Sequence, residues 1–324
     1  MLLLLLACLH HLPEPVGGYQ AQRHAPPASL AEVFAKQDPQ AVYDEAVARR
    51  MDGDFQGAIE RLAWLSLRDP SPRVLYQLGI AHELGGEPHE ALAVYDQLLL
   101  SEPGPDWERD ASFRRGLCFE DLGDWEAAYA QYQAIPARGL DGEELWTLQI
   151  SRAITELHTN RTRAGRRHLE RTLGASEDTS ITWIRAKGWY HLMLDSLAEP
   201  TPLAQPTERK QVKALRARAG QLVDAERELV QIVHLKEPEF ILAGLLGLGD
   251  GYASLAIDLA ALPAPEGLSD DVLALYQRGV TEKVNTLRRK AWECYDQGLV
   301  VAGTFGLEGE QVEVLMVRRE GLGL

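Results

Sequence analysis

The feature that constrains the fold most is a short pattern that recurs at a nearly fixed spacing. The segment 52–59 (DGDFQGAI) recurs as 85–92 (GGEPHEAL) and again as 122–129 (LGDWEAAY). Within it, a glycine and an alanine keep spacings of 33 and 37 residues from one copy to the next. A period in this range is typical of chains built from stacked supersecondary units, each burying its apolar face against its neighbours.

Composition narrows the classes of function. The chain has 324 residues, of which 45% are hydrophobic and 25% charged, as in ordinary globular proteins. Its net charge of −15 disfavours a nucleic-acid binder, which needs a cationic surface. Three cysteines are too few for a disulfide framework. No uninterrupted run of 18 apolar residues occurs, so we expect no membrane-spanning helix.

The repeat resembles the tetratricopeptide repeat, a helix–turn–helix unit of 34 residues. The matching residues of the second unit are Leu75, Leu78, Gly79, Ala91, Tyr95 and Pro103. Those of the first are Val42, Ala46, Ala58, Leu62 and Pro70, and those of the third are Gly116, Phe119, Ala128, Tyr132 and Pro136. The resemblance implies an all-α solenoid of antiparallel helix hairpins forming a right-handed superhelix. We interpret Gly79 and Gly116 as sites of close helix packing.

Three parts of the chain are expected. Residues 1–30 form a truncated signal and tether, residues 31–200 an array of about five repeats, the last ones degenerate, and residues 201–324 a region of longer helices. The stretch from Tyr252 to Tyr295 looks like the C-terminal region of tetratricopeptide lipoproteins from gliding and predatory deltaproteobacteria. That resemblance suggests a role in gliding-motility machinery.

The N-terminus suggests a compartment. Leu5-Leu6-Ala7-Cys8 resembles the lipobox of bacterial lipoproteins, in which the cysteine carries the lipids. The segment 9–29 after it is rich in proline, glycine and polar residues and reads as a flexible tether. We therefore expect lipidation of Cys8 and a place in the bacterial cell envelope, on the periplasmic face of the outer membrane. The alternative is a cytoplasmic protein with an apolar N-terminus.

In a tetratricopeptide array the first helices of the repeats line a concave groove. The resemblance places nine apolar residues on that wall: Tyr43, Val47, Tyr76, Ile80, Phe113, Leu117, Ile150, Ile154 and Trp189. The chaperone-binding branch has Lys and Asn at these positions to hold a peptide carboxylate, so this chain lacks that clamp. An apolar ladder suits an extended peptide or an amphipathic helix. The alternative is that the chain covers the ladder itself.

A second candidate surface is basic, although the chain is acidic. Five arginines cluster after residue 160 and either form a solvated helix face or bind an acidic partner: Arg161, Arg163, Arg166, Arg167 and Arg171. The glycine-rich segment 247–251 lies within a helical pattern, which favours packing over a phosphate loop. Cys118 and Cys294 are expected to be small buried apolar side chains.

These patterns predict a non-enzymatic scaffold. No catalytic motif is present, and no cofactor, metal ion, small-molecule substrate or nucleic acid is expected. The expected partners are proteins that place a peptide or helix in the groove, with membrane attachment only through the lipid. The alternative function is an accessory or regulatory subunit of an envelope enzyme that acts on peptidoglycan or polysaccharide.

Overall fold

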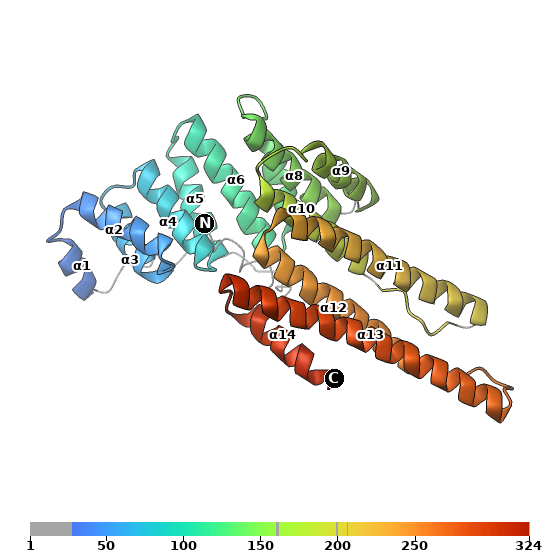
Figure 1. Ribbon diagram of the computed structural model, residues 1–324. Helices are drawn as coiled ribbons and strands as arrows, with labels where there is room; N and C mark the ends of the chain where they lie inside the picture. Colours follow the sequence, from blue (N-terminus) through green and yellow to red (C-terminus); the bar gives the residue numbers. More distant parts are fainter. Residues whose placement is uncertain (1–27, 160–161, 199, 206, 324) are drawn as a thin grey trace. The chain divides into compact units, whose positions relative to one another are not determined.

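A computed structural model describes residues 28–159, 162–198, 200–205 and 207–323 of the chain. In this part of the chain every regular element is an α-helix, which confirms the predicted fold class (Figure 1). The chain divides after Gly165 into two compact units. Cys8 lies outside the described residues.

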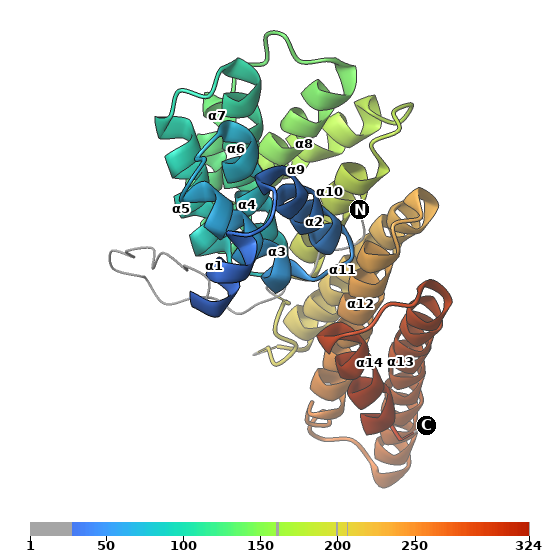
Figure 2. The same cartoon turned by 90° about the vertical axis from the view of Figure 1, so that its left-hand side faces the viewer.

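The first unit is a succession of helix hairpins (Figure 2). α2 packs against α3, α4 against α5 and α6 against α7, and contacts also join α3 to α4, α5 to α6 and α7 to α8. The core therefore continues from one repeat to the next. The helices of this unit are α1 (Ala28–Phe34), α2 (Pro39–Met51), α3 (Phe55–Ser66), α4 (Pro72–Leu84), α5 (Pro88–Leu100), α6 (Pro105–Asp121), α7 (Trp125–Ala134) and α8 (Gly142–His158).

The recurring glycine makes the turn inside each hairpin. Its φ angle is positive in all three copies, at 85°, 76° and 71° for Gly53, Gly86 and Gly123. Only glycine adopts this region without steric cost. In the first and third turns the next residue caps the second helix, since Asp54 accepts a hydrogen bond from Gly57 N at 2.9 Å and Asp124 accepts one from the backbone three residues on. The repeated sequence therefore specifies both the turn and the start of the next helix.

The second unit contains longer helices. Its helices are α9 (Thr162–Ala175), which begins just before the division, α10 (Thr182–Leu197), α11 (Glu208–Leu235), α12 (Pro238–Ala260), α13 (Asp270–Phe305) and α14 (Glu310–Gly321). α10 packs against α11 and α12, α12 against α13, and α13 against α14. α11, α12 and α13 are longer than any helix of the first unit, as the sequence predicts for the region after residue 200. The division after residue 165 lies earlier than the boundary expected at residue 200, because α10 joins the long helices.

The apolar composition of α12 bears on the expectation that no helix spans a membrane. By length and composition this helix is able to cross a membrane, although Asp250 interrupts its apolar sequence. Most of its apolar stretch is buried in the structure, between α10, α11 and α13. A core helix that is covered on several sides needs apolar residues around its circumference. The packing of α12 therefore accounts for its composition.

Candidate functional site

Three aromatic side chains stand at one repeat position on the first helices of the first unit. Tyr43 on α2, Tyr76 on α4 and Phe113 on α6 are each half-buried. We call these three residues the aromatic face. Because they remain partly exposed at the same place in three consecutive hairpins, they form the strongest candidate for a contact surface.

Arginines from the following repeat contact two residues of the aromatic face. The guanidinium of Arg73 on α4 lies 3.8 Å from the ring centroid of Tyr43. Arg114 on α6 donates a hydrogen bond from Nε to the hydroxyl of Tyr76 at 3.3 Å. The ring of Trp107 meets that of Tyr76 edge-on, with 5.1 Å between centroids. Cation–π and edge contacts of this kind hold the rings in place.

Fewer residues of the apolar ladder are accessible in the structure than the sequence predicts. Val47 is half-buried, but only 6% of Ile80 and 8% of Leu117 is exposed. Ile150 and Ile154 have no exposed surface, so the prediction that they are accessible to a partner is not met. The register places them on the inner wall, but their side chains belong to the core.

Trp189 also differs from the predicted ladder. It is half-buried on α10, which belongs to the second unit. The aromatic face belongs to the first unit. The residues of the predicted groove that are both accessible and together are those of the first three repeats.

A buried ionic network lies beside the aromatic face. Arg114 Nη1 pairs with Glu83 Oε1 at 2.8 Å, and the hydroxyl of Tyr95 donates to the other carboxylate oxygen at 2.9 Å. Burial by itself lowers the pKa of Arg114, but Glu83, Tyr95 and Tyr76 together outweigh it and the pKa is raised. Burial, and next the same carboxylate, raise the pKa of Tyr95. Both donors therefore hold their protons more tightly than exposed side chains of the same type.

Two family models match the repeat region. Residues 43–107 and residues 110–138 match family models described as tetratricopeptide repeat. Residues 43–138 form tetratricopeptide repeats. Among solved structures, that of a tetratricopeptide repeat protein from Parabacteroides merdae ATCC 43184 covers 88% of this chain and 99% of its own, with 14% identity and a TM-score of 0.42. No curated protein matches the sequence significantly.

The sequence analysis missed the arginines and the tryptophan beside the tetratricopeptide aromatic positions. Arg114 directly follows Phe113, and Arg73 precedes Tyr76 by three residues. A basic residue next to an aromatic repeat position was the available signal. Only the structure shows that each arginine reaches the aromatic side chain of the preceding repeat.

The structure separates the members of the arginine cluster that follows the tetratricopeptide repeats into one that forms ion pairs within the protein and three that are exposed. Arg166 is held inside the second unit, where it pairs with Asp195 at 2.7 Å and with Glu228 at 2.5 Å. It is therefore a structural residue, which corrects its assignment to a patch for acidic partners. Arg163, Arg167 and Arg171 are exposed. Arg161 lies outside the described residues.

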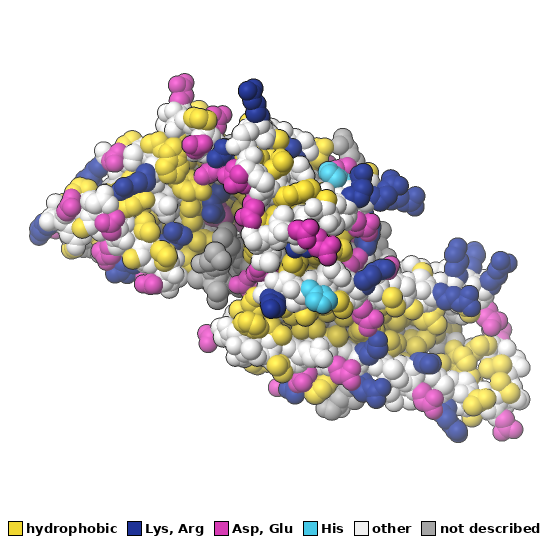
Figure 3. All heavy atoms as spheres, turned by 45° about the horizontal axis from the view of Figure 1, so that its top comes forward, with side chains coloured by type: hydrophobic (Ala, Val, Ile, Leu, Met, Phe, Trp, Pro, Cys, Tyr) yellow, Lys and Arg dark blue, Asp and Glu magenta, His cyan; other side chains and the backbone are white. Residues whose placement is uncertain are grey.

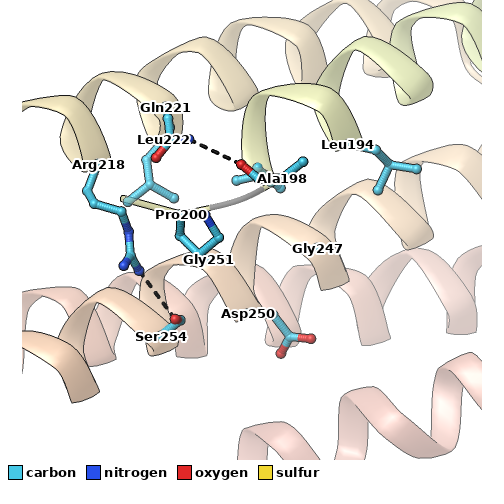
Figure 4. A pocket seen from close by; sticks show the side chains of 11 residues that line it. Leu194, Ala198, Pro200, Arg218, Gln221, Leu222, Gly247, Asp250, Gly251 and Ser254 are labelled. Atoms are coloured by element: carbon cyan, nitrogen blue, oxygen red, sulfur yellow. Dashed lines mark hydrogen bonds between the residues drawn. The ribbon is translucent and has the colours of Figure 1, made fainter. Parts of the chain in front are cut away.

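A cavity of about 350 Å³ lies within the second unit (Figure 4). Its polar groups are mostly used by the protein: Arg218 pairs with Asp258 at 2.7 Å and donates to Ser254 Oγ at 3.2 Å. Gln221 donates to the carbonyl of Ala198 at 3.3 Å. The cavity is lined by Leu194, Leu197, Ala198, Pro200, Arg218, Gln221, Leu222, Gly247, Asp250, Gly251 and Ser254. It offers mainly apolar wall and no reactive group.

The glycines of the segment 247–251 lie on α12 rather than in a phosphate loop. A β-carbon on Gly249 would lie 2.4 Å from Cε1 of Tyr295, and one on Gly251 would lie 2.9 Å from Leu222. The prediction that these glycines serve helix packing is confirmed for these two positions. Glycine permits the close approach of α13 and α11 to α12.

The described residues offer no metal site or reactive thiol. No group of three or more His, Cys, Asp or Glu side chains among them could hold a metal ion. Cys118 and Cys294 are buried. Burial raises the pKa of the Cys294 thiol to about 12 and raises that of Cys118 further. At neutral pH both are thiols rather than nucleophilic thiolates.

Proposed function

We propose that this protein is a non-enzymatic scaffold that binds a peptide or helical segment of a partner protein on its aromatic face. The observation that supports the proposal is the recurrence of Tyr43, Tyr76 and Phe113 at one position of three consecutive repeats, each half-buried. Aromatic side chains supply much of the binding energy of protein interfaces and often lie near their centre. Arg73 and Arg114 hold the rings of Tyr43 and Tyr76 before a partner arrives, so binding orders few additional side chains.

The test changes Tyr76 and Phe113 to Ser together in the full chain. We expect the proteins that co-purify with the wild type from its native cells to be lost from this variant, with little change in the thermal midpoint. An aromatic anchor contributes about 2 kcal/mol or more at an interface. The control changes Leu67 and Leu100, which are exposed at the C-terminal ends of α3 and α5 in the same unit, to Ser. The control should retain the same proteins.

The same experiment separates a binding surface from an internal core. If the double variant unfolds at a lower temperature while its co-purifying proteins stay the same, the aromatic face supports the fold and the proposal is wrong. Measuring both properties on one preparation distinguishes these outcomes.

We also propose that the protein is tethered by lipid at Cys8 in a bacterial envelope. The support is the sequence Leu5-Leu6-Ala7-Cys8 alone. Cells that express the native gene with labelled palmitate should incorporate the label, and Cys8→Ala should abolish incorporation. Equal labelling of the two proteins, or none in either, would contradict the tether without affecting the aromatic face.

A further inference from the structure

Arg50 on α2 carries a charge that the protein does not compensate. The side chain is half-buried, and its Nε atom is buried without a hydrogen-bond partner. In the described part of the chain no carboxylate forms an ion pair with it. Guanidinium groups do not lose their proton in proteins. A partly desolvated cation without a counter-charge costs stability.

In the second repeat, the residue at the position equivalent to Arg50 has a neutralised charge. Glu83 stands 33 residues after Arg50, at the equivalent place on α4, and it pairs with Arg114 of the following repeat. At the junction between the first and second repeats, Gln77 occupies the position that Arg114 occupies at the junction between the second and third repeats, 37 residues later. A neutral amide cannot neutralise Arg50, and Gln77 Oε1 is itself buried without a partner. The arginine charge is therefore neutralised at the junction between the second and third repeats, but not at the junction between the first and second.

Arg50 belongs to the same side of α2 as the aromatic face. Val47 and Tyr43 precede it by three and seven residues, which are one and two helical turns. Burial and then the nearby charge of Arg114 lower the pKa of Arg50, while Tyr43, Tyr95 and Tyr76 oppose them. Arg114 and these tyrosines are therefore close enough to act electrostatically on the guanidinium, and Arg114 is itself paired with Glu83.

We propose that Arg50 receives the carboxylate of an Asp or Glu side chain in the partner segment that lies on the aromatic face. This inference rests on the function proposed above. A carboxylate matches the planar guanidinium with two parallel hydrogen bonds, and the apolar surroundings strengthen such a pair. Binding would supply the charge that the first junction lacks, so the partner is an acidic segment flanked by apolar residues.

A side chain fits better than the carboxylate at the end of a partner chain. A terminal carboxylate in a repeat groove needs several donors, and the neighbouring wall positions hold Tyr43, Val47, Tyr76 and Ile80 instead. One guanidinium is enough for one side-chain carboxylate. The aromatic residues then take the apolar groups on either side of it.

The test uses the full chain and a phage-displayed library of random 12-residue peptides as the probe. The strongest binder is synthesised with free and with amidated C-terminus, and with each Asp or Glu changed in turn to Asn or Gln. Its Kd is measured by fluorescence anisotropy for the wild type, for Arg50→Gln, and for Arg138→Gln. Arg138 is exposed in a loop of the same unit, so this variant controls for the loss of one positive charge.

We expect one acid-to-amide change in the peptide to weaken binding to the wild type and to Arg138→Gln about tenfold or more. The same change should alter binding to Arg50→Gln less than twofold, and amidation of the C-terminus should have no effect. The thermal midpoint of Arg50→Gln should equal or exceed that of the wild type, because an unpaired charge is removed.

Besides dependence on the peptide C-terminus, three results would overturn the inference alone: binders without acidic residues, an acid-to-amide effect that persists in Arg50→Gln, or a clear fall in the thermal midpoint of that variant. The last would show that Arg50 supports the fold. Dependence on the peptide C-terminus would assign Arg50 to a chain end instead. Failure of the proposed function gives a different result, namely no binders or binders that are insensitive to changing Tyr76 and Phe113 to Ser.

Discussion

The ring of Tyr95 fills the space that a side chain on Gly79 would need, since a β-carbon on that glycine would lie 2.3 Å from Cε1 of the ring. Gly116 and Tyr132 repeat the relationship at the same 2.3 Å. A similar pair links α12 and α13 in the second unit, where Gly249 faces Tyr295 at 2.4 Å. The longer helices therefore keep the glycine–tyrosine packing of the repeat hairpins.

This relationship predicts that Gly79→Ala destabilises the protein, although alanine favours helices. The helix propensity gained is about 1 kcal/mol, but the added methyl group forces the Tyr95 ring or the backbone of α5 to move. Overpacking of this kind costs about 1–3 kcal/mol. We expect a lower midpoint in urea than for the wild type.

Gly142→Ala is the matched control. Gly142 begins α8 in the same unit, and a β-carbon built there meets no atom within 4 Å. This variant should keep the midpoint of the wild type or raise it. If both substitutions have the same effect on the midpoint, the packing of Tyr95 against α4 does not limit the size of residue 79.

The sequence predicted these helix contacts because their chemistry is local and periodic. Gly79 and Tyr95 recur 37 residues later as Gly116 and Tyr132, so stacking alone aligns them. The helical pattern around the segment 247–251 likewise placed its glycines on a helix. At these positions close helix packing restricts the residue to glycine.

The sequence could not predict which wall residues stay exposed. Val47 and Ile154 hold the same repeat position, yet one is half-buried and the other is fully buried. Their burial depends on neighbours from other helices, which the repeat register does not specify. The pairing of Arg166 with Glu228, 62 residues later in the chain, is of the same kind.

The Glu83–Arg114 pair predicts a strong penalty for removing one partner. Arg114→Gln leaves a carboxylate that is only 3% exposed without its cation. Breaking a buried pair in this way typically costs about 3–5 kcal/mol. The double variant Glu83→Gln, Arg114→Gln should recover much of that loss, because no unpaired charge remains. Urea unfolding of both single variants and the double variant measures the coupling, and additive effects would contradict it.

The buried thiols predict a simple chemical readout. In a Cys8→Ala protein, neither Cys118 nor Cys294 should react with a disulfide reagent at pH 8 in the folded state, because burial raises the pKa of both thiols. Both should react in guanidinium chloride. Rapid reaction of one thiol in the folded protein would show that the helix carrying it opens readily.

Glu239 predicts a pH dependence of stability. Burial, and next the charge of Glu237, raise its pKa from about 4.5 to about 7. Because the folded state holds this proton more tightly than the unfolded state, stability falls as pH rises from about 4.5 through 7 and then levels off. The wild type should therefore lose stability across this range, where Glu239 becomes charged at the start of α12.

Glu239→Gln should remove that loss. At pH 8 we expect the variant to be more stable by about 1–2 kcal/mol, a figure reduced from the full shift because the side chain is partly exposed. At pH 4.5 the two proteins should unfold at nearly the same temperature. Glu313→Gln, at an exposed position on α14, controls for the change of charge. Equal midpoints of wild type and Glu239→Gln at both pH values would show that water reaches the Glu239 carboxylate in the folded protein.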